Sequence, residues 1–187
     1  MMGTIKKLLL EIIPVVIGIL LALILNGMVE DYQSKKYFRQ SLKAIVEENE
    51  HNIKELKYAL ERQKAYADTL NVYYSSDTMS LFDITLAAKG FYTPDLKLTS
   101  WKFLLEDSKH TLIPIEMINK LTEIEKNYNT SQLHGKIAMD IIYDEKYFKK
   151  SASKMPMRVL LMDINESENN MLRVLEDFAQ YVKEQDF

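Results

Sequence analysis

The chain has few of the residues that build disulfide-rich, metal-binding or turn-rich proteins. Its 187 residues include no cysteine, five glycines, four prolines and three histidines. The lack of cysteine excludes disulfides, thiol catalysis and cysteine-ligated zinc, although it does not fix the compartment. So few glycines and prolines leave little room for the turns of a β-sandwich or barrel. Leu, Ile, Lys, Glu and Met are abundant instead, which favours an all-α fold.

Charge of one sign is not in strong excess either. The formal net charge is −3, and because residues 1–28 are slightly basic, the remainder is mildly acidic. A mildly acidic domain without a recognition motif is a poor binder of DNA or RNA. We therefore expect no nucleic-acid partner.

Catalytic motifs are missing as well. The sequence has no glycine-rich phosphate loop, no G-x-S-x-G and no H-E-x-x-H. Glu48 and His51 have the spacing of di-iron bundle ligands, and Asp107 and His110 repeat that spacing. A di-iron site needs two Glu-x-x-His motifs and two further carboxylates, whereas the second pair begins with Asp in a broken region. We expect no catalytic residue, no metal and no cofactor.

One long hydrophobic run is present. Residues 8–29 read LLLEIIPVVIGILLALILNGMV, and a helix of this length, about 33 Å, matches a bilayer core of about 30 Å. The run is longer than the apolar part of a signal peptide and has no small-residue cleavage site. We predict a short tail over residues 1–7 and an uncleaved transmembrane helix over residues 8–29, with the lipid bilayer as the first partner.

Four residues of this span are candidates for function. A carboxylate in a span is costly, so Glu11 is either a snorkelling partner of Lys7 or a group used in oligomer contacts or ion coupling. Gly18 and Ala22 form a small-x-x-x-small pair, and Asn26 lies one turn further on the same face. Such a face permits close helix approach and interhelical hydrogen bonds. It predicts a homo-oligomer or pairing with other membrane proteins, although chance alone often places Gly and Ala in a span.

Residues 30–187 are predicted to form one helical-bundle domain. Long helices are expected over about 30–74, 114–150 and 156–184, with short helices and loops over 77–113. The first long helix continues the span and carries a heptad stripe, formed by Leu42, Val46, Asn49, Ile53, Leu56, Leu60, Gln63, Ala67, Leu70 and Tyr74. Its polar members, Asn49 and Gln63, are candidates for fixing the register of a second chain.

The other two long helices carry stripes of their own. In the last helix the stripe is Met157, Leu161, Ile164, Glu168, Met171, Leu175, Phe178 and Val182, with Glu168 expected to be hydrated. In the middle helix it is Met117, Leu121, Ile124, Tyr128, Ile137, Ile141, Tyr143, Tyr147 and Phe148. Two interruptions of this helix are expected as alternatives, a bend at Gly135 or a split at the loop-prone residues 127–131. Antiparallel packing predicts that the first helix leads outward, residues 77–113 turn the chain at the far end, the next helix returns and the last leads outward again.

Two groups of aromatic residues are candidates for contacts. The first joins aromatic and basic side chains that suit the headgroup zone of a membrane: Lys36, Tyr37, Phe38, Arg39, Lys146, Tyr147, Phe148, Lys149 and Lys150. The second is expected at the far end of the bundle as a partner surface: Phe91, Tyr92, Trp101 and Phe103. Ordinary core packing is the alternative for both groups.

The span also carries a family resemblance. Glu11-Ile12, Val15-Val16-Ile17-Gly18-Ile19 and Asn26 resemble the membrane signature of an uncharacterised family of small single-span inner-membrane proteins in Gram-negative bacteria. A second likeness covers residues 98–113. The chain departs from the usual signature at Leu10, where glycine is common, and at Pro14. The resemblance implies a cytoplasmic N-terminus and a periplasmic domain, and it implies no biochemical activity.

These features together predict a membrane-anchored helical bundle that acts as an interaction or scaffolding subunit of a bacterial envelope complex. The alternative is an extracytoplasmic bundle that senses a small molecule and signals through a partner. A metal-dependent bundle enzyme is the least favoured reading.

Overall fold

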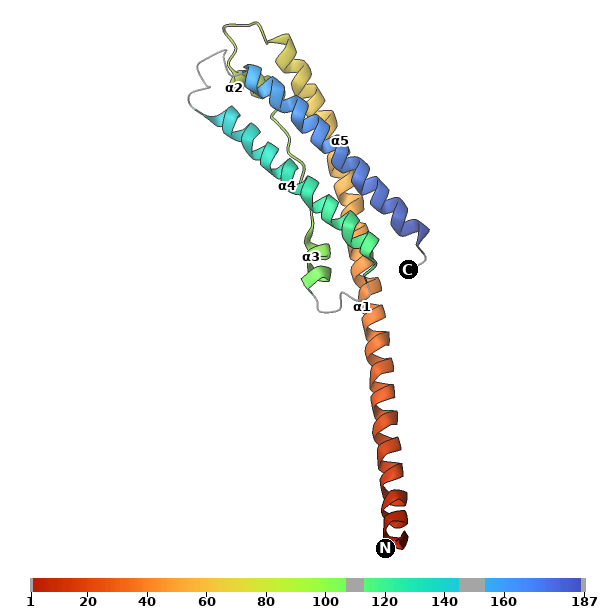
Figure 1. Cartoon of the computed structure of the whole chain (residues 1–187). Helices are drawn as coiled ribbons and strands as arrows, with labels where there is room; N and C mark the ends of the chain where they lie inside the picture. The colour runs from red at the N-terminus through yellow and green to blue at the C-terminus, as the bar shows by residue number, and fades with distance from the viewer. Residues whose placement is uncertain (1, 107–112, 145–153, 186–187) are drawn as a thin grey trace.

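All regular secondary structure in the described part of the chain is helical. The computed structural model describes residues 2–106, 113–144 and 154–185. Its helices are α1 (Met2–Val72), α2 (Leu81–Ala87), α3 (Thr99–Glu106), α4 (Ile115–Tyr143) and α5 (Lys154–Glu184). Figure 1 shows a bundle on top of one long protruding helix. The predicted all-α bundle, with an N-terminal apolar helix that continues into it, is confirmed.

Helix α1 is both a protruding stalk and a core member of the bundle. It runs without a break through Pro14, where a proline removes one backbone hydrogen bond. Residues 12–31 are exposed, and along the described side chains of α1 the first buried residue is Phe38. We call residues 2–37 the stalk, and name the two ends of the bundle the stalk end and the distal end.

The direction of α4 and α5 differs from the prediction. Phe38 of α1 shares a hydrophobic cluster with Met117 near the start of α4 and Phe178 near the end of α5. Helix α4 therefore leads outward and α5 returns, which places the C-terminal end of α5 near the stalk end (Figure 1).

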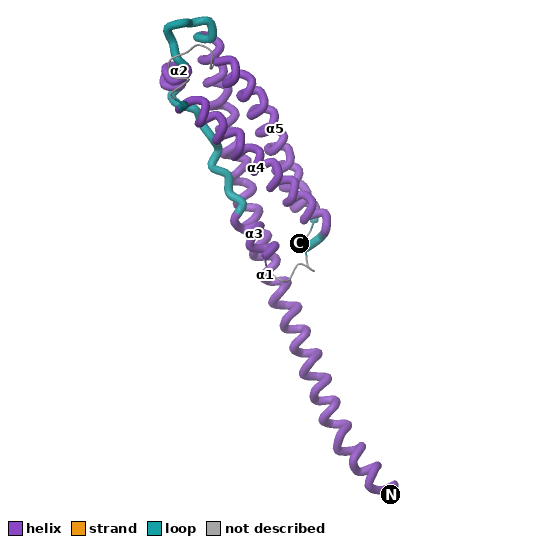
Figure 2. The backbone as a smooth tube through the Cα atoms, turned by 60° about the vertical axis from the view of Figure 1, so that its left-hand side comes forward, coloured by secondary structure: helices purple, strands orange, loops and turns teal. Residues whose placement is uncertain are grey.

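The reason lies in residues 91–98, which were expected to be a local loop. This segment is extended and runs back along the bundle from α2 to α3 (Figure 2). Eight extended residues cover about 26 Å, enough to return the chain to the stalk end before α4 begins.

The bundle thus has four members side by side, and only three of them are long helices. Helix α5 packs against both α1 and α4. The other side of α1 is covered by α2, the extended segment and α3, and α2 also contacts α4. We call α2, residues 88–98 and α3 together the composite element. It occupies the place that a fourth helix would take in a four-helix bundle.

The composite element explains why the predicted stripe of α1 contains only half of the residues that α1 buries. One half of the predicted stripe is buried, namely Leu42, Asn49, Leu56, Gln63 and Leu70, whereas the other half is only partly buried. The second buried row is shifted by one position: Phe38, Ile45, Asn52, Ala59 and Tyr66. This row includes a polar and a small residue, so it did not stand out as apolar.

Helix α4 deviates from its predicted stripe after Tyr128. Ser131, Ala138 and Ile142 are buried, whereas Ile137 is 37% and Tyr143 is 59% exposed. Gly135 does not divide the helix, which continues to Tyr143. A Cβ at Gly135 would lie 3.0 Å from Thr93 Cγ2, so the glycine permits close contact with the extended segment. The predicted end of this helix at residue 150 lies outside the described residues. The stripe of α5 is confirmed from Met157 to Phe178.

Candidate functional site

Polar side chains of α1 replace the sheet partner that the extended segment lacks. Asn52 donates from Nδ2 to the Lys97 carbonyl (2.7 Å) and accepts from the Lys97 N–H at Oδ1 (2.8 Å). Arg62 donates to the carbonyl of Lys89 (2.9 Å), just after α2. Because buried backbone groups must find partners, these contacts hold the composite element on α1.

Glu48 and His51, the first pair with metal-ligand spacing, also contact backbone groups of the composite element. The Glu48 carboxylate accepts from the Ser100 N–H at 2.9 and 3.1 Å, so it caps the first turn of α3 from a different helix. His51 Nε2 lies 3.1 Å from the Asp95 carbonyl oxygen. In the described part of the chain, no three His, Asp or Glu side chains come close enough to hold a metal.

A polar layer crosses the middle of the bundle. Each long helix contributes one buried polar residue to it: Gln63 from α1, Ser131 from α4 and Glu168 from α5. Along every helix these residues fall between the stalk-end hydrophobic cluster and the distal one. The two apolar clusters are therefore separated by polar groups.

Glu168 is the most unusual member of this layer. Its side chain is only 2% exposed, although the sequence reading expected a hydrated position. Burial raises the pKa of the Glu168 carboxyl to about 7, against a smaller lowering by its hydrogen bond from Gln63. The carboxyl therefore changes its charge near neutral pH.

Gln63 links three parts of the fold. Its Nε2 donates to the Tyr92 carbonyl of the extended segment (3.1 Å) and to Glu168 Oε1 on α5 (3.0 Å). In the described part of the chain, Gln63 Oε1 and Glu168 Oε2 are buried without a hydrogen-bond partner. Ser131 Oγ is likewise buried without a partner in the described residues, so the layer holds three unpartnered polar atoms, of which the Gln63 and Glu168 oxygens are acceptors.

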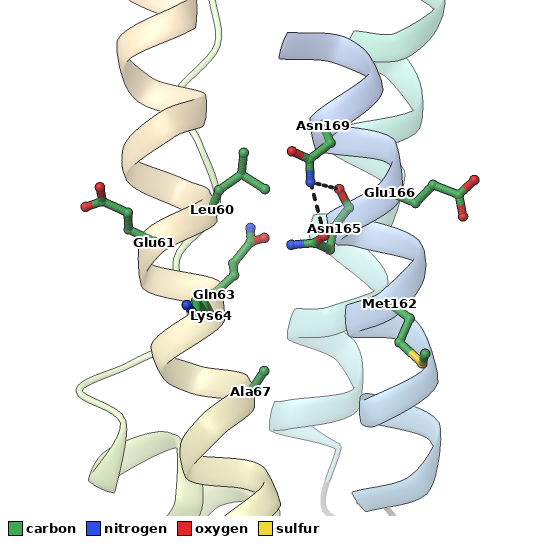
Figure 3. Close-up of a pocket in the computed structure, with 9 residues that line it drawn as sticks. All are labelled: Leu60, Glu61, Gln63, Lys64, Ala67, Met162, Asn165, Glu166 and Asn169. Atoms are coloured by element: carbon green, nitrogen blue, oxygen red, sulfur yellow. Dashed lines mark hydrogen bonds between the residues drawn. The ribbon is translucent and has the colours of Figure 1, made fainter. Parts of the chain in front are cut away.

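A groove lies beside this layer, between α1 and α5. It has a volume of about 680 Å³, and Figure 3 shows its lining side chains on the two helices. The residues that line it are Leu60, Glu61, Gln63, Lys64, Ala67, Met162, Asn165, Glu166 and Asn169.

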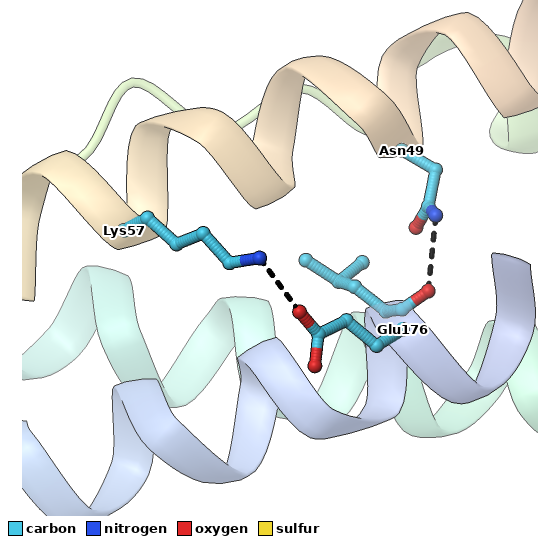
Figure 4. Close-up of polar contacts among 4 residues, drawn as sticks. Asn49, Lys57 and Glu176 are labelled. Carbon is cyan, nitrogen blue, oxygen red and sulfur yellow. Dashed lines mark hydrogen bonds and ion pairs between the residues drawn. The ribbon is translucent and has the colours of Figure 1, made fainter.

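Two further contacts hold α1 on α5 nearer the stalk end. Asn49 Nδ2 donates to the Leu175 carbonyl (3.0 Å), and Lys57 Nζ lies 2.8 Å from Glu176 Oε1 (Figure 4). Asn49 and Gln63 are therefore used inside this chain, and they do not serve the register of a second copy as the sequence had suggested.

The candidate residues of the span lie on the stalk. Gly18, Ala22 and Asn26 are exposed, and an added Cβ at Gly18 would meet nothing within 4 Å. Asn26 Nδ2 donates to Glu30 Oε1 one turn later (2.8 Å). Glu11 belongs to α1, but its side chain lies outside the described residues.

Only the first four residues of the aromatic–basic group lie within the described part of the chain. Lys36 and Arg39 are exposed beside the stalk end, Tyr37 is half-buried and Phe38 is a core residue. The second group, Lys146, Tyr147, Phe148, Lys149 and Lys150, lies outside the described residues. Lys154, which follows it, donates from Nζ to the Tyr73 carbonyl (2.8 Å) at the distal end of α1. The predicted direction of the helix that precedes Lys146, which was expected to return toward the stalk end, is therefore wrong.

The predicted aromatic partner surface is divided between the two ends. Trp101 is 3% exposed and belongs to the stalk-end core. Phe91 packs edge-on against Tyr66 at 5.3 Å, and Tyr92 packs edge-on against Tyr58 at 4.8 Å. The side chain of Phe103 lies outside the described residues. Trp101, Phe91 and Tyr92 hold the composite element in place, and they do not form one distal surface.

Sequence reasoning named Gln63 only as a candidate for fixing register and Glu168 only as a hydrated member of its stripe, and it did not join the two in one site. Each is a polar residue on an otherwise apolar stripe, which is the signal that could have identified them. The chain matches no protein-family model, no curated protein and no solved structure. The family resemblance seen in the span therefore stays a prediction.

Proposed function

We propose that this chain is a membrane-anchored, non-catalytic subunit whose bundle holds other proteins of a bacterial envelope complex. The observation that carries the proposal is the form of α1. Its apolar part is long enough to cross a membrane and is not buried by any other part of the described chain. The same helix then becomes a core element of the bundle, so one continuous helix joins the span to the bundle.

The spacing along α1 supports this arrangement. From Val29, the last residue of the apolar run, to Phe38 the helix rises about 13 Å. A headgroup zone is about 5–8 Å deep on each side, so the stalk end of the bundle would lie just above it. Lys36 and Arg39 could then reach back to lipid phosphates.

The proposed location is the inner membrane, with a cytoplasmic N-terminus and a periplasmic bundle. Lys6 and Lys7 precede the span and Glu30 and Asp31 follow it, which favours this orientation, whereas Lys35, Lys36, Arg39 and Lys43 soon after the span oppose it under the positive-inside rule. The family resemblance of the span decides the proposed orientation. A C-terminal alkaline phosphatase fusion should be active, and a C-terminal fluorescent protein that matures only in the cytosol should be dark. The reverse pattern would overturn this orientation.

Association is proposed to begin on the Gly18, Ala22 and Asn26 face. Cysteines at these three positions should crosslink in membranes, whereas cysteines at positions 17, 20 and 24 should not. Gly18→Leu should weaken crosslinking because a bulky side chain separates the helix backbones. Equal crosslinking of both sets would leave α1 as a plain tether.

Partner binding needs its own experiment. The full chain, solubilised in mild detergent with an affinity tag, should co-purify with one or a few membrane or envelope proteins at fixed ratio. A variant whose residues 8–29 are replaced by an unrelated span controls for the bundle alone. Recovery of the tagged chain by itself in both forms would contradict the scaffolding role.

A further inference from the structure

The groove between α1 and α5 has an apolar wall and an acidic rim. Leu60, Ala67 and Met162 provide the apolar surface, and Met162 is 68% exposed. The charged residues of the lining are two acidic ones, Glu61 and Glu166, and one basic one, Lys64, so the lining carries a net negative charge. The wall suits a short aliphatic chain, and the rim favours a cation over an anion.

The polar group facing this groove has a fixed orientation. The two contacts of Gln63 Nε2 are both to acceptors, the Tyr92 carbonyl and Glu168 Oε1, so the NH₂ group must face them. The amide oxygen is left as an acceptor without a partner in the described part of the chain. Figure 3 shows the Gln63 amide extending from α1 with this oxygen directed toward α5. The side chain is 3% exposed.

Behind this amide lies a carboxylate without a counter-ion. In the described part of the chain no basic side chain pairs with Glu168, and its Oε2 has no hydrogen-bond partner. Burying a carboxylate in this way is unfavourable unless a cation or donor is supplied. Both free atoms of the pair are acceptors, so the missing component is a donor.

We propose that the groove binds a short aliphatic ammonium compound. Its carbon chain lies on Leu60, Ala67 and Met162. Its ammonium group displaces the side chains that cover Gln63 Oε1 in the unliganded bundle and donates to this oxygen in front of Glu168. An ammonium group brings three N–H donors and a positive charge, which a neutral alcohol of the same shape lacks. Because Gln63 joins α1, α5 and the extended segment, binding would stabilise all three together.

The test uses the full chain in detergent micelles and n-butylammonium chloride as the probe. The unfolding midpoint at pH 8 should rise in a saturable manner with n-butylammonium, and should not rise with n-butanol or with sodium chloride at equal ionic strength. In Glu168→Gln the apparent affinity should fall at least tenfold, since the substitution removes the negative charge that lies behind Gln63 and attracts the ammonium group. No saturable rise with the wild-type chain, or an equal response in Glu168→Gln, would overturn the proposal.

A second pair of variants keeps the test decisive if Glu168→Gln is poorly folded. Met162→Lys places a competing ammonium group in the groove on an already exposed side chain, and should abolish the response. Leu133→Lys, at a residue of α4 that is 55% exposed and outside the groove lining, should keep it. Equal responses of these two variants would also overturn the site. Neither outcome affects the anchoring proposal, which is tested by fusions and by crosslinking in membranes.

Discussion

Gln63 and Glu168 lie 105 positions apart in the sequence and meet across the bundle at 3.0 Å. This contact joins the first and last helices at the boundary between the two hydrophobic clusters. It also buries a carboxyl group, and this burial raises the pKa of Glu168. The stability of the bundle should therefore depend on pH.

The pH dependence has a defined sign. The Glu168 pKa is raised from its ordinary value of 4.5 to about 7 in the fold, so the folded chain holds the proton more tightly than the unfolded chain. Its stabilising effect is complete below about pH 4.5 and is lost as pH rises through about 7, by about 3 kcal/mol in total. Urea unfolding of the full chain should show lower stability at pH 8 than at pH 5.

Glu168→Gln provides the control for this dependence. The amide cannot ionise, so the difference between pH 5 and pH 8 should shrink by most of that amount. If the variant keeps the pH slope of the wild type, another group is responsible for it.

Loss of the Asn52 side chain should release the composite element. Asn52→Ala removes both hydrogen bonds to Lys97, and should lower the free energy of unfolding by about 1–3 kcal/mol. Hydrogen exchange of the Lys97 amide should accelerate more than that of α5. Asn129→Ala, at an exposed residue of α4, should change stability little; similar losses in both variants would show that Asn52 has no special role.

Gly135 and Thr93 should be energetically coupled. Gly135→Ala improves helix propensity by about 1 kcal/mol, but its Cβ would lie 3.0 Å from Thr93 Cγ2. The gain should therefore appear only when Thr93→Ser removes that methyl group. A double-mutant cycle should give a coupling of at least about 0.5 kcal/mol, and additive effects would mean that the extended segment moves aside without cost.

Substitution by Asp should unfold the bundle at the core position Leu161 but not at its exposed neighbour Met162. Leu161 is 7% exposed and Met162 is 68% exposed. Leu161→Asp buries an unpaired charge at a cost of several kcal/mol and should unfold the bundle, as should Leu56→Asp. Met162→Asp should leave the thermal midpoint nearly unchanged. A folded Leu161→Asp variant would refute the assigned face of α5.

The α5 seam was predictable because large apolar residues alternate at steps of four and three from Met157 to Phe178. The second α1 row was not, because Asn52 and Ala59 are selected by their tertiary neighbours. Asn52 pairs with the backbone of the extended segment, and that pairing leaves no hydrophobic signal in α1. In α4, likewise, the seam passes through Ser131 and Gly135, where close approach matters more than hydrophobicity.

The candidate site was predictable only in its parts. A carboxyl on an apolar stripe marks Glu168, and an amide on another stripe marks Gln63. Their meeting depends on the direction of α5, which in turn depends on how far residues 91–98 travel. An eight-residue linker without periodicity does not reveal whether it turns on the spot or crosses the whole bundle.

The unbroken α1 also sets an angular phase between the stalk and the bundle. Residues 30–36 of the stalk lie between the apolar run and the first buried residue, Phe38, so residues inserted there would leave every buried contact intact. One added residue would rotate the Gly18 face by about 100° relative to Glu168, and seven would return it to within about 20°. A function that needs only a tether would tolerate every insertion equally. A function that needs the bundle to face a neighbouring protein would be lost and regained as the number of inserted residues follows the period of the helix.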